Sequence, residues 1–224
     1  MSYPINYPTP QGANIQIFTD RTRNLAAATS FNWTKPQGAS FVWFTLIGAG
    51  GNGNGTPPSA FGGGSGAVTN FMCPAFLIPD SLVISLPQPN SSSSTKVRYQ
   101  QKASTPYDLL TANNGQDAAA GTAMTANAFT AMGFFQSIAG QDGGAYTVGQ
   151  TASATTFLSG GAGATVTSNY GYSTGINNAG YFQMQPIIVG VAGGGGNGIG
   201  GIGCGGGYTA GVSGGNGMVV IITW

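Results

Sequence analysis

The chain has 224 residues, of which 40 are glycine, and only 5 % of its residues are charged. Globular proteins contain about 7 % glycine and about 25 % charged residues. Six basic and five acidic residues leave a net charge of +1, and histidine is absent. The composition therefore excludes an extended basic surface for nucleic acid, and it excludes histidine-based catalysis.

The remaining composition favours one folded, β-rich unit. Hydrophobic residues make up 41 % and aromatic residues 11 %, which argues against a disordered chain. The residues that cover helix surfaces, above all Glu, Lys and Arg, are scarce. A soluble monomer normally carries more surface charge, so we expect part of the surface to be buried against copies of the chain or another protein.

Neither secretion nor insertion into a membrane is expected. The start of the chain lacks a basic region followed by an apolar run, so it does not have the pattern of a signal peptide. No apolar stretch approaches the roughly 18 residues of a membrane-spanning helix.

Two segments near the start are predicted to adopt an extended conformation. Residues 15–19, IQIFT, alternate apolar and polar side chains, as a small strand or a docking arm does. Residues 41–47, FVWFTLI, are mostly aromatic or β-branched, so this strand should be covered on both faces. We assign residues 1–35 to an N-terminal docking arm and residues 36–224 to a single glycine-rich β domain.

Four more strands are predicted in the first half of the domain. Residues 67–73 and 82–86 are apolar segments on either side of a Pro-Asp turn. Residues 96–100 alternate charged and apolar side chains, as a half-exposed strand does, and residues 107–111 are their expected partner.

The second half holds further extended segments, of which the last matters most. Residues 218–224 are apolar, and an open edge on such a strand favours aggregation. We expect it to pair with residues 41–47 or to insert into a subunit interface. The other segments are residues 134–140, as a strand or a single helical turn, and residues 155–158 and 186–191.

The glycine stretch after residues 41–47 matches the G-x-G-x-x-G pattern of dinucleotide-binding loops, from Gly48 to Gly53. Such a site needs a helix that begins at the last glycine, but Pro57 and Pro58 follow and prevent one. No acidic residue lies between Asp20 and Asp80 to bind a ribose. Nucleotide binding is therefore not predicted, and no cofactor is expected.

A second glycine run, residues 193–207, is predicted to form closely packed extended backbone and not a flexible linker. Ordering so many glycines is costly in backbone entropy. Glycine chains in the polyproline II conformation pack closely because no Cβ separates them, with Ile199, Ile202 and Cys204 as anchors. The alternative is a flexible linker. The pattern does not distinguish packing within one subunit from packing across several.

Reactive residue types are few. Cys73 and Cys204 form neither a disulfide framework nor a zinc site, so we predict buried thiols of a protein made in a reducing cytoplasm. A carboxylate pair of the glycosidase type could come from Asp108, Asp117 and Asp142. Because six bases accompany five aspartates, ion pairs and turn hydrogen bonds are expected instead. We predict no enzyme, no catalytic residues and no metal site.

Two groups of loop residues have the composition of adaptable binding loops, in which Tyr, Asn and Gly predominate. Their aromatic rings would stack on glycan rings, and their amides would bond to glycan hydroxyls. The same residues could instead pack on a neighbouring subunit. The first group is Tyr170, Tyr172, Asn177, Asn178, Tyr181 and Phe182, and the second is Asn113, Asn114, Gln116 and Asp117.

Residues 33–39, WTKPQGA, lead through the predicted strand into a glycine run. This order resembles the Trp-x-x-Pro-x-Gly turn, apolar strand and glycine run of glycine-rich tail-fibre and receptor-binding proteins of bacteriophages. Residues 203–207 and 214–224, with their glycines, Val/Ile strand and final Trp, resemble the end of the same family. The resemblance brackets residues 31–224, although residues 90–185 match in composition only.

The resemblance implies a virion protein, usually a homotrimer, at a fibre tip or elsewhere on the outside of the particle, assembled in the host cytoplasm. It carries over no catalytic residue. Many such fibres have a long shaft before this domain, whereas this chain has a short segment there, which favours a small knob or decoration protein. The expected fold is an all-β, jelly-roll-like sandwich with long glycine-rich loops, assembled as a trimer.

Three functions remain open from the sequence. The first is a fibre-tip or receptor-binding protein that docks on other virion proteins through its N-terminal arm and contacts a host surface glycan or protein. The second is a capsid or tail structural component without a ligand. The third is a cellular glycine-rich surface fibre or adhesin. None of them involves nucleic acid or insertion into a membrane.

Overall fold

The computed structural model describes residues 12–20, 28–55, 59–101, 104–144, 199–208 and 210–224. This part of the chain consists of β-strands, extended segments and two short 3-10 helices, η1 (Ala75–Leu77) and η2 (Thr130–Met132). The strands are β1 (Asn14–Thr19), β2 (Thr29–Thr34), β3 (Phe41–Ile47), β4 (Val68–Pro74), β5 (Ser81–Leu86), β6 (Ser94–Tyr99), β7 (Tyr107–Asn113), β8 (Phe134–Ile138) and β9 (Met218–Thr223). Within these residues, no helix is long and apolar enough to cross a bilayer.

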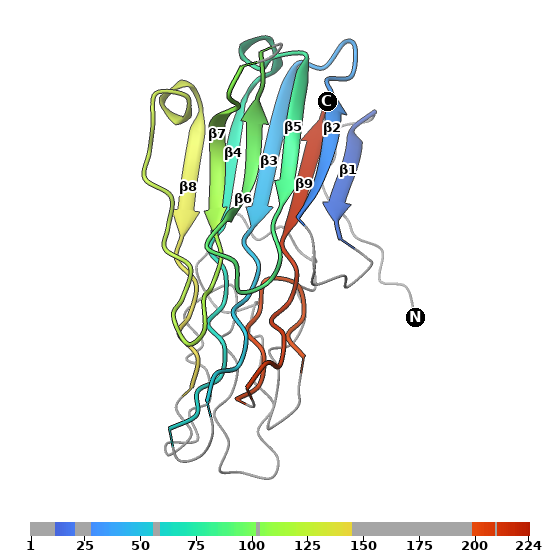
Figure 1. Ribbon diagram of the computed structural model, residues 1–224. Coiled ribbons are helices and arrows are strands. Elements are labelled where there is room, and N and C mark those ends of the chain that lie inside the picture. The colour runs from blue at the N-terminus through green and yellow to red at the C-terminus, as the bar shows by residue number, and fades with distance from the viewer. Residues whose placement is uncertain (1–11, 21–27, 56–58, 102–103, 145–198, 209) are drawn as a thin grey trace.

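The strands form two antiparallel sheets, which lie as two layers in Figure 1. The first sheet has the order β1-β9-β3-β4-β8, and the second has the order β2-β5-β6-β7. The all-β prediction is therefore confirmed. The meander of β5, β6 and β7 is simpler than the two Greek keys of a jelly roll, so the expected connectivity differs there.

One hydrophobic core lies between the two sheets. Side chains alternate between the two faces of a strand, so every second residue of each sheet points inward. Phe44 and Ile221 of the first sheet and Trp33 and Leu110 of the second are at most 1 % exposed and belong to one cluster. The rings of Trp33 and Phe44 meet edge to face across the layers, 6.1 Å apart.

Most of the predicted strands are confirmed within one or two residues. The last strand, β9, pairs with β3 along its length, as expected, and also with β1. The pairing of β6 with β7 is confirmed as well, with an irregularity between Val97 and Arg98. The segments predicted at residues 155–158 and 186–191 lie outside the described residues.

The first strands differ from the expected arm. β1 is a full member of the first sheet, and β2 pairs with β5 in the second. Of the two interpretations of residues 15–19, the strand is therefore the one observed. A second difference concerns β4 and β5, which are consecutive but belong to different sheets. η1 and the Pro-Asp turn carry the chain from one layer to the other.

The charged residues of β6 and β7 form a small network on the outside of the second sheet. The Asp108 carboxylate accepts hydrogen bonds from Lys96 Nζ and Arg98 Nε, both at 2.7 Å. Partial burial raises the pKa of Asp108, but the hydrogen bonds and positive charges of Lys96 and Arg98 outweigh burial, so the net pKa is lowered from 3.8.

The lowered pKa predicts a contribution to acid sensitivity. An aspartate whose pKa is depressed in the folded state stabilises the fold above its unfolded pKa, and this stabilisation disappears as the pH falls through the folded pKa. We expect Asp108→Asn to be less stable than the wild type at neutral pH, with a difference that shrinks below about pH 4. Urea unfolding at several pH values measures it. A difference independent of pH would contradict the role of the ionised carboxylate.

Candidate functional site

The pairing of β3 with β4 continues beyond the sheet through two glycine-rich segments, residues 48–55 and 59–67. Their hydrogen-bonded residues recur at every third position, whereas a β-ladder repeats every second. A repeat of three residues is that of the polyproline II helix, which rises about 3.1 Å per residue, so the hairpin reaches roughly 20 Å beyond the sheet. The bonds join Gly48 to Ala67, Gly51 to Gly64 and Asn54 to Phe61.

Backbone hydrogen bonds join residues 48–55, 59–67, 113–121, 139–144 and 199–206 into a glycine-rich module. Residues 62–67 lie at its centre. Their backbone N–H groups donate to three neighbouring segments in strict rotation, one neighbour for each side of a threefold helix. Residues 48–55 pack as a fourth neighbour, because they donate to the carbonyls of Gly64 and Ala67. The donors are Gly62 and Ser65 to residues 141–144, Gly63 and Gly66 to residues 203–206, and Gly64 and Ala67 to residues 113–117.

Close approach of backbones explains the glycine content of the module. A Cβ added at Gly63 would meet the carbonyl group of Gly51, and one added at Gly143 would meet the carbonyl group of Gly62. Both contacts would be far shorter than 3.0 Å, a separation below which real Cβ atoms essentially never approach other atoms. Residues 199–207 are packed in the same way, because Gly206, Gly203 and Cys204 accept backbone hydrogen bonds from Gly63, Gly66 and Gly215. For these described residues the packed interpretation is the one observed, not the flexible linker.

The predicted anchors of the second glycine run behave differently from one another. Cys204 is fully buried, and Ile202 packs beside it against the outside of the first sheet. Ile199 is 51 % exposed and does not act as an anchor. Cys73 lies in the core between the sheets, where burial raises the pKa of its thiol to about 11. Both cysteines are buried thiols, as predicted.

Of the predicted binding residues, Asn113 and Asn114 are turned inward to support the module. The Asn114 side chain is 7 % exposed, accepts a bond from Ala49 N–H and donates to the carbonyl of Gln88. The Asn113 amide donates to the Thr122 carbonyl and accepts a bond from the Ser94 hydroxyl. The Asn114 amide holds the end of the second sheet to the glycine segment at Ala49, and the Asn113 amide joins β6 to Thr122. The expected polar loop tip therefore begins only at Gln116.

Asp117 and Asn90 form a clip that the sequence analysis did not identify. Both have positive φ, 44° and 59°, which is uncommon for residues other than glycine. The Asn90 amide donates to the Asp117 carboxylate at 3.1 Å, and its oxygen accepts bonds from the backbone N–H groups of Asp117 and Asn52. The only signal in the sequence is that Asn and Asp tolerate the left-handed conformation.

The remaining aspartates of the described chain have structural partners. Asp80 pairs with Lys35 at 2.8 Å, Asp142 caps the backbone N–H of Ala120, and Asp20 accepts a bond from the Thr29 hydroxyl. The expected ion pairs and turn hydrogen bonds are thus observed. The described residues contain no group of three His, Cys, Asp or Glu side chains that could hold a metal ion.

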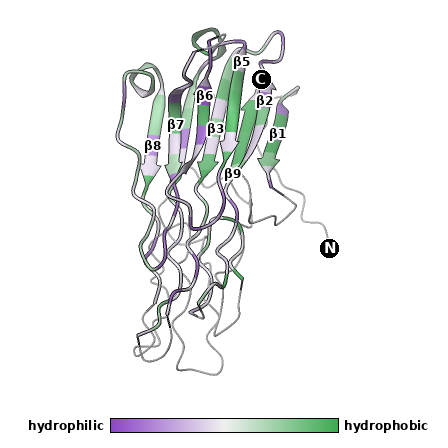
Figure 2. Ribbon diagram, viewed as in Figure 1, coloured by the Kyte–Doolittle hydropathy of each residue, from purple (hydrophilic) through white to green (hydrophobic). Residues whose placement is uncertain are grey.

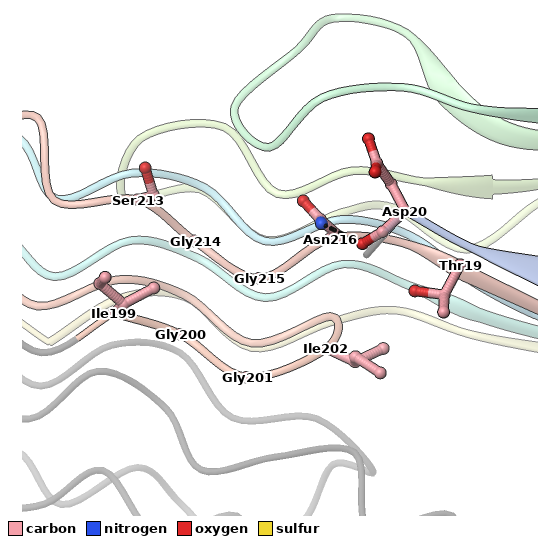
Figure 3. Close-up of a pocket in the computed structure, with 10 residues that line it drawn as sticks. All are labelled: Thr19, Asp20, Ile199, Gly200, Gly201, Ile202, Ser213, Gly214, Gly215 and Asn216. Atoms are coloured by element: carbon pink, nitrogen blue, oxygen red, sulfur yellow. Dashed lines mark hydrogen bonds between the residues drawn. The ribbon is translucent and has the colours of Figure 1, made fainter. Parts of the chain in front are cut away.

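A cleft of about 520 Å³ lies where the end of β1 meets the glycine-rich module (Figure 3). Thr19, Asp20 and Asn216 stand at one end of it, and the wall is mainly glycine backbone. The Asn216 amide donates to the Asp20 carbonyl at 2.8 Å. Among the described residues, the polar side chains at this end of the cleft are a carboxylate, a hydroxyl and an amide, which can hold a small polar group by hydrogen bonds.

The first group of predicted binding residues, from Tyr170 to Phe182, lies outside the described residues. The structure nevertheless shows the framework from which the intervening segment starts and to which it returns, because residues 139–144 and 199–206 are both packed in the glycine-rich module. No family model, curated protein or solved structure matches the chain.

Proposed function

We propose that the protein is a bacteriophage virion protein on the outer surface of the particle, a tail-fibre tip or receptor-binding protein that acts as a homotrimer. It would dock on other virion proteins through its N-terminal residues and contact a glycan or protein of the host surface. The resemblance of residues 33–51 and 203–224 to glycine-rich tail-fibre proteins motivates the proposal. No catalytic step is part of it.

The observation that carries the proposal is the glycine-rich module. Its extended segments continue from one end of the strands and run away from the two sheets (Figure 1). Successive residues of 62–67 donate hydrogen bonds to three neighbouring segments in turn. The segments therefore support one another without needing a hydrophobic core. Extended segments that are held together in this way suit the recognition of a surface by the residues they carry, because binding residues gain affinity when they are held in place.

One observation favours the alternative of a structural component without a ligand. Three of the four amide and acid residues predicted to bind, Asn113, Asn114 and Asp117, hold the protein's own segments together. If the aromatic residues between 170 and 182 also pack on neighbouring subunits, the protein would strengthen the particle instead of binding the host.

The proposal predicts that particles carrying Tyr170→Ala and Tyr172→Ala assemble normally but adsorb more slowly to host cells. Truncation of a tyrosine at an interface hot spot costs about 2 kcal/mol or more, and about 1.4 kcal/mol corresponds to tenfold, so we expect a reduction of about tenfold or greater. Tyr107→Ala is the matched control, because Tyr107 is 58 % exposed and lies at the end of the strands away from the glycine-rich module.

The readouts are the adsorption rate constant and the yield of particles. Failure of assembly in the tyrosine variants, with normal assembly of the Tyr107→Ala control, would favour the structural component. Normal adsorption of all variants would contradict receptor binding by these tyrosines. A gene located among cellular rather than phage genes would favour the third function, a cellular surface fibre or adhesin.

A further inference from the structure

The outer face of the first sheet is uncharged and largely apolar, with Thr45, Asn70 and the exposed Gln136 as polar residues in its middle row. The five strands of this sheet contain no charged residue. Directly opposed residues form an unbroken hydrophobic row across all five strands on that face. The row is Ile15, Ile222, Trp43, Met72 and Phe134. The hydroxyl of Thr45, which is buried on this face, donates a hydrogen bond to the Asn70 side chain at 2.8 Å. Contact with another apolar surface would therefore meet no charge on this face.

The glycine-rich module covers only one end of this face. Cys204 and Ile202 pack over Ile47, Val68 and Met218 in a cluster of their own. Toward the other end the side chains become accessible: Ile15 is 46 % exposed, Ile17 is 60 % exposed, and Phe41, which stacks on Trp224, is 40 % exposed. On β9, Ile222 is 7 % and Val220 is 2 % exposed, so the accessible side chains lie at the β1 edge and at the Phe41 end of the face, not across all of it. Accessible apolar side chains that lie together mark interaction sites, whereas scattered ones do not.

The outer face of the second sheet shows what a solvated face of this protein looks like. Ser30, Asn32 and Thr34 of β2 are all exposed. Lys96, Arg98 and Asp108 occupy β6 and β7 and pair with one another. In Figure 2, β6 is partly purple whereas β9 is green along its length. The chain therefore places its few charged strand residues on one layer and leaves the other layer uncharged.

We propose that copies of this chain associate through the outer face of the β1-β9-β3-β4-β8 sheet. The inference rests on the self-association in the proposed function and names the surface responsible. The absence of charge on this face favours a second copy of the chain as the partner that covers it. An uncharged face presents no charge that a neighbouring copy would repel, and a net charge of +1 gives little repulsion between copies. An acidic or basic partner would find no charge to pair with and would bury its own at a cost.

The size of the face determines how strong the contact is. Five strands about 4.8 Å apart, with about six residues of 3.3 Å each, give a face of roughly 500 Å². A second copy can cover only part of it, because residues such as Val220 and Ile47 are already buried within the chain. A stable interface buries about 800 Å² on each partner. The face alone therefore supports association that depends on concentration, and the adjoining edge of β1 can extend it. β1 has neither charge, proline nor an irregular register, the features that usually protect an edge strand.

The experiment measures native mass by sedimentation over about a hundredfold range of concentration, because mass action makes an assembly dissociate on dilution. The variant is Ile15→Lys with Ile17→Lys, which places two charges on exposed positions of an edge strand. The matched control is Ser30→Lys with Asn32→Lys, which makes the same change on the edge strand of the other sheet. Circular dichroism and thermal unfolding establish that each variant is folded.

We expect the wild type and the control to sediment as an oligomer, with three times the 22.4 kDa of one chain for the proposed homotrimer, and the folded Ile15/Ile17 variant to sediment as a monomer. A wild type that stays monomeric throughout, or an equal loss of assembly in the control, would overturn the inference. So would an oligomeric Ile15/Ile17 variant. Adsorption to host cells is measured separately, so failure of receptor binding and failure of this interface are distinguishable.

Discussion

Gly63→Ala is expected to destabilise the protein by about 3 kcal/mol or more. A glycine replaced by alanine in a compatible site usually gains about 0.4–1 kcal/mol, because the unfolded chain loses freedom. Here the new methyl would meet the carbonyl of Gly51 and the backbone nitrogen of Gly206. Those atoms belong to hydrogen-bonded neighbours that cannot move apart without breaking the module, so the sign of the effect is reversed.

The measurement is the free energy of unfolding in urea, with Gly38→Ala as the control. Gly38 has φ +80° and nothing within 4 Å of an added Cβ. It therefore reports only the cost of placing alanine in the left-handed region, roughly 1–2 kcal/mol. If Gly63→Ala proved no more costly than Gly38→Ala, the backbone-to-backbone packing of the module would be wrong.

Trp33→Ala is expected to cost about 4 kcal/mol. Trp33 is 1 % exposed and reaches across the layers to Phe44, with the two rings at 67°. Its removal leaves a large cavity between the sheets, where neighbouring side chains belong to two separate hydrogen-bonded layers and collapse only in part. Urea unfolding measures the loss.

Two companion variants separate packing from other effects. Trp33→Phe keeps much of the ring and removes a buried indole nitrogen that has no hydrogen-bond partner, so we expect a loss clearly smaller than that of Trp33→Ala. Tyr107→Ala, at an exposed position, should change the free energy by less than about 0.5 kcal/mol. Equal losses for the alanine and phenylalanine variants of Trp33 would contradict the cavity argument.

The sequence by itself determined the strands. Residues 41–47 and 218–224 are so apolar and β-branched that a buried sheet was expected for both. The need to cover an open edge left pairing between them or insertion into a subunit interface as the two options, and the structure shows the pairing. Dense glycine without a Gly-X-Y repeat also indicated packed extended chains. The roles of the aspartates were predicted from composition, because a chain with few charged residues of both signs is expected to use them in ion pairs and turns. Lys35 with Asp80 and Lys96 with Asp108 are such ion pairs.

Tertiary structure decided where these strands and side chains lie. Residues 15–19 suited an arm as well as a strand, and only the open edge of β9 made them β1. Asn113 and Asn114 have the composition of a binding loop. Asn114 is nevertheless buried, because the backbone N–H of Ala49 in the glycine segment beside it needs a hydrogen-bond partner, and Asn113 bonds to Ser94 and Thr122.

The apolar outer face was also beyond the reach of sequence. Ile15 and Trp43 are far apart in the chain, and their place in one row depends on the register of three strands. The threefold rotation of bonds around residues 62–67 likewise requires neighbours from distant parts of the chain. Local pattern reveals which residues extend, but long-range pairing sets which of them share a surface.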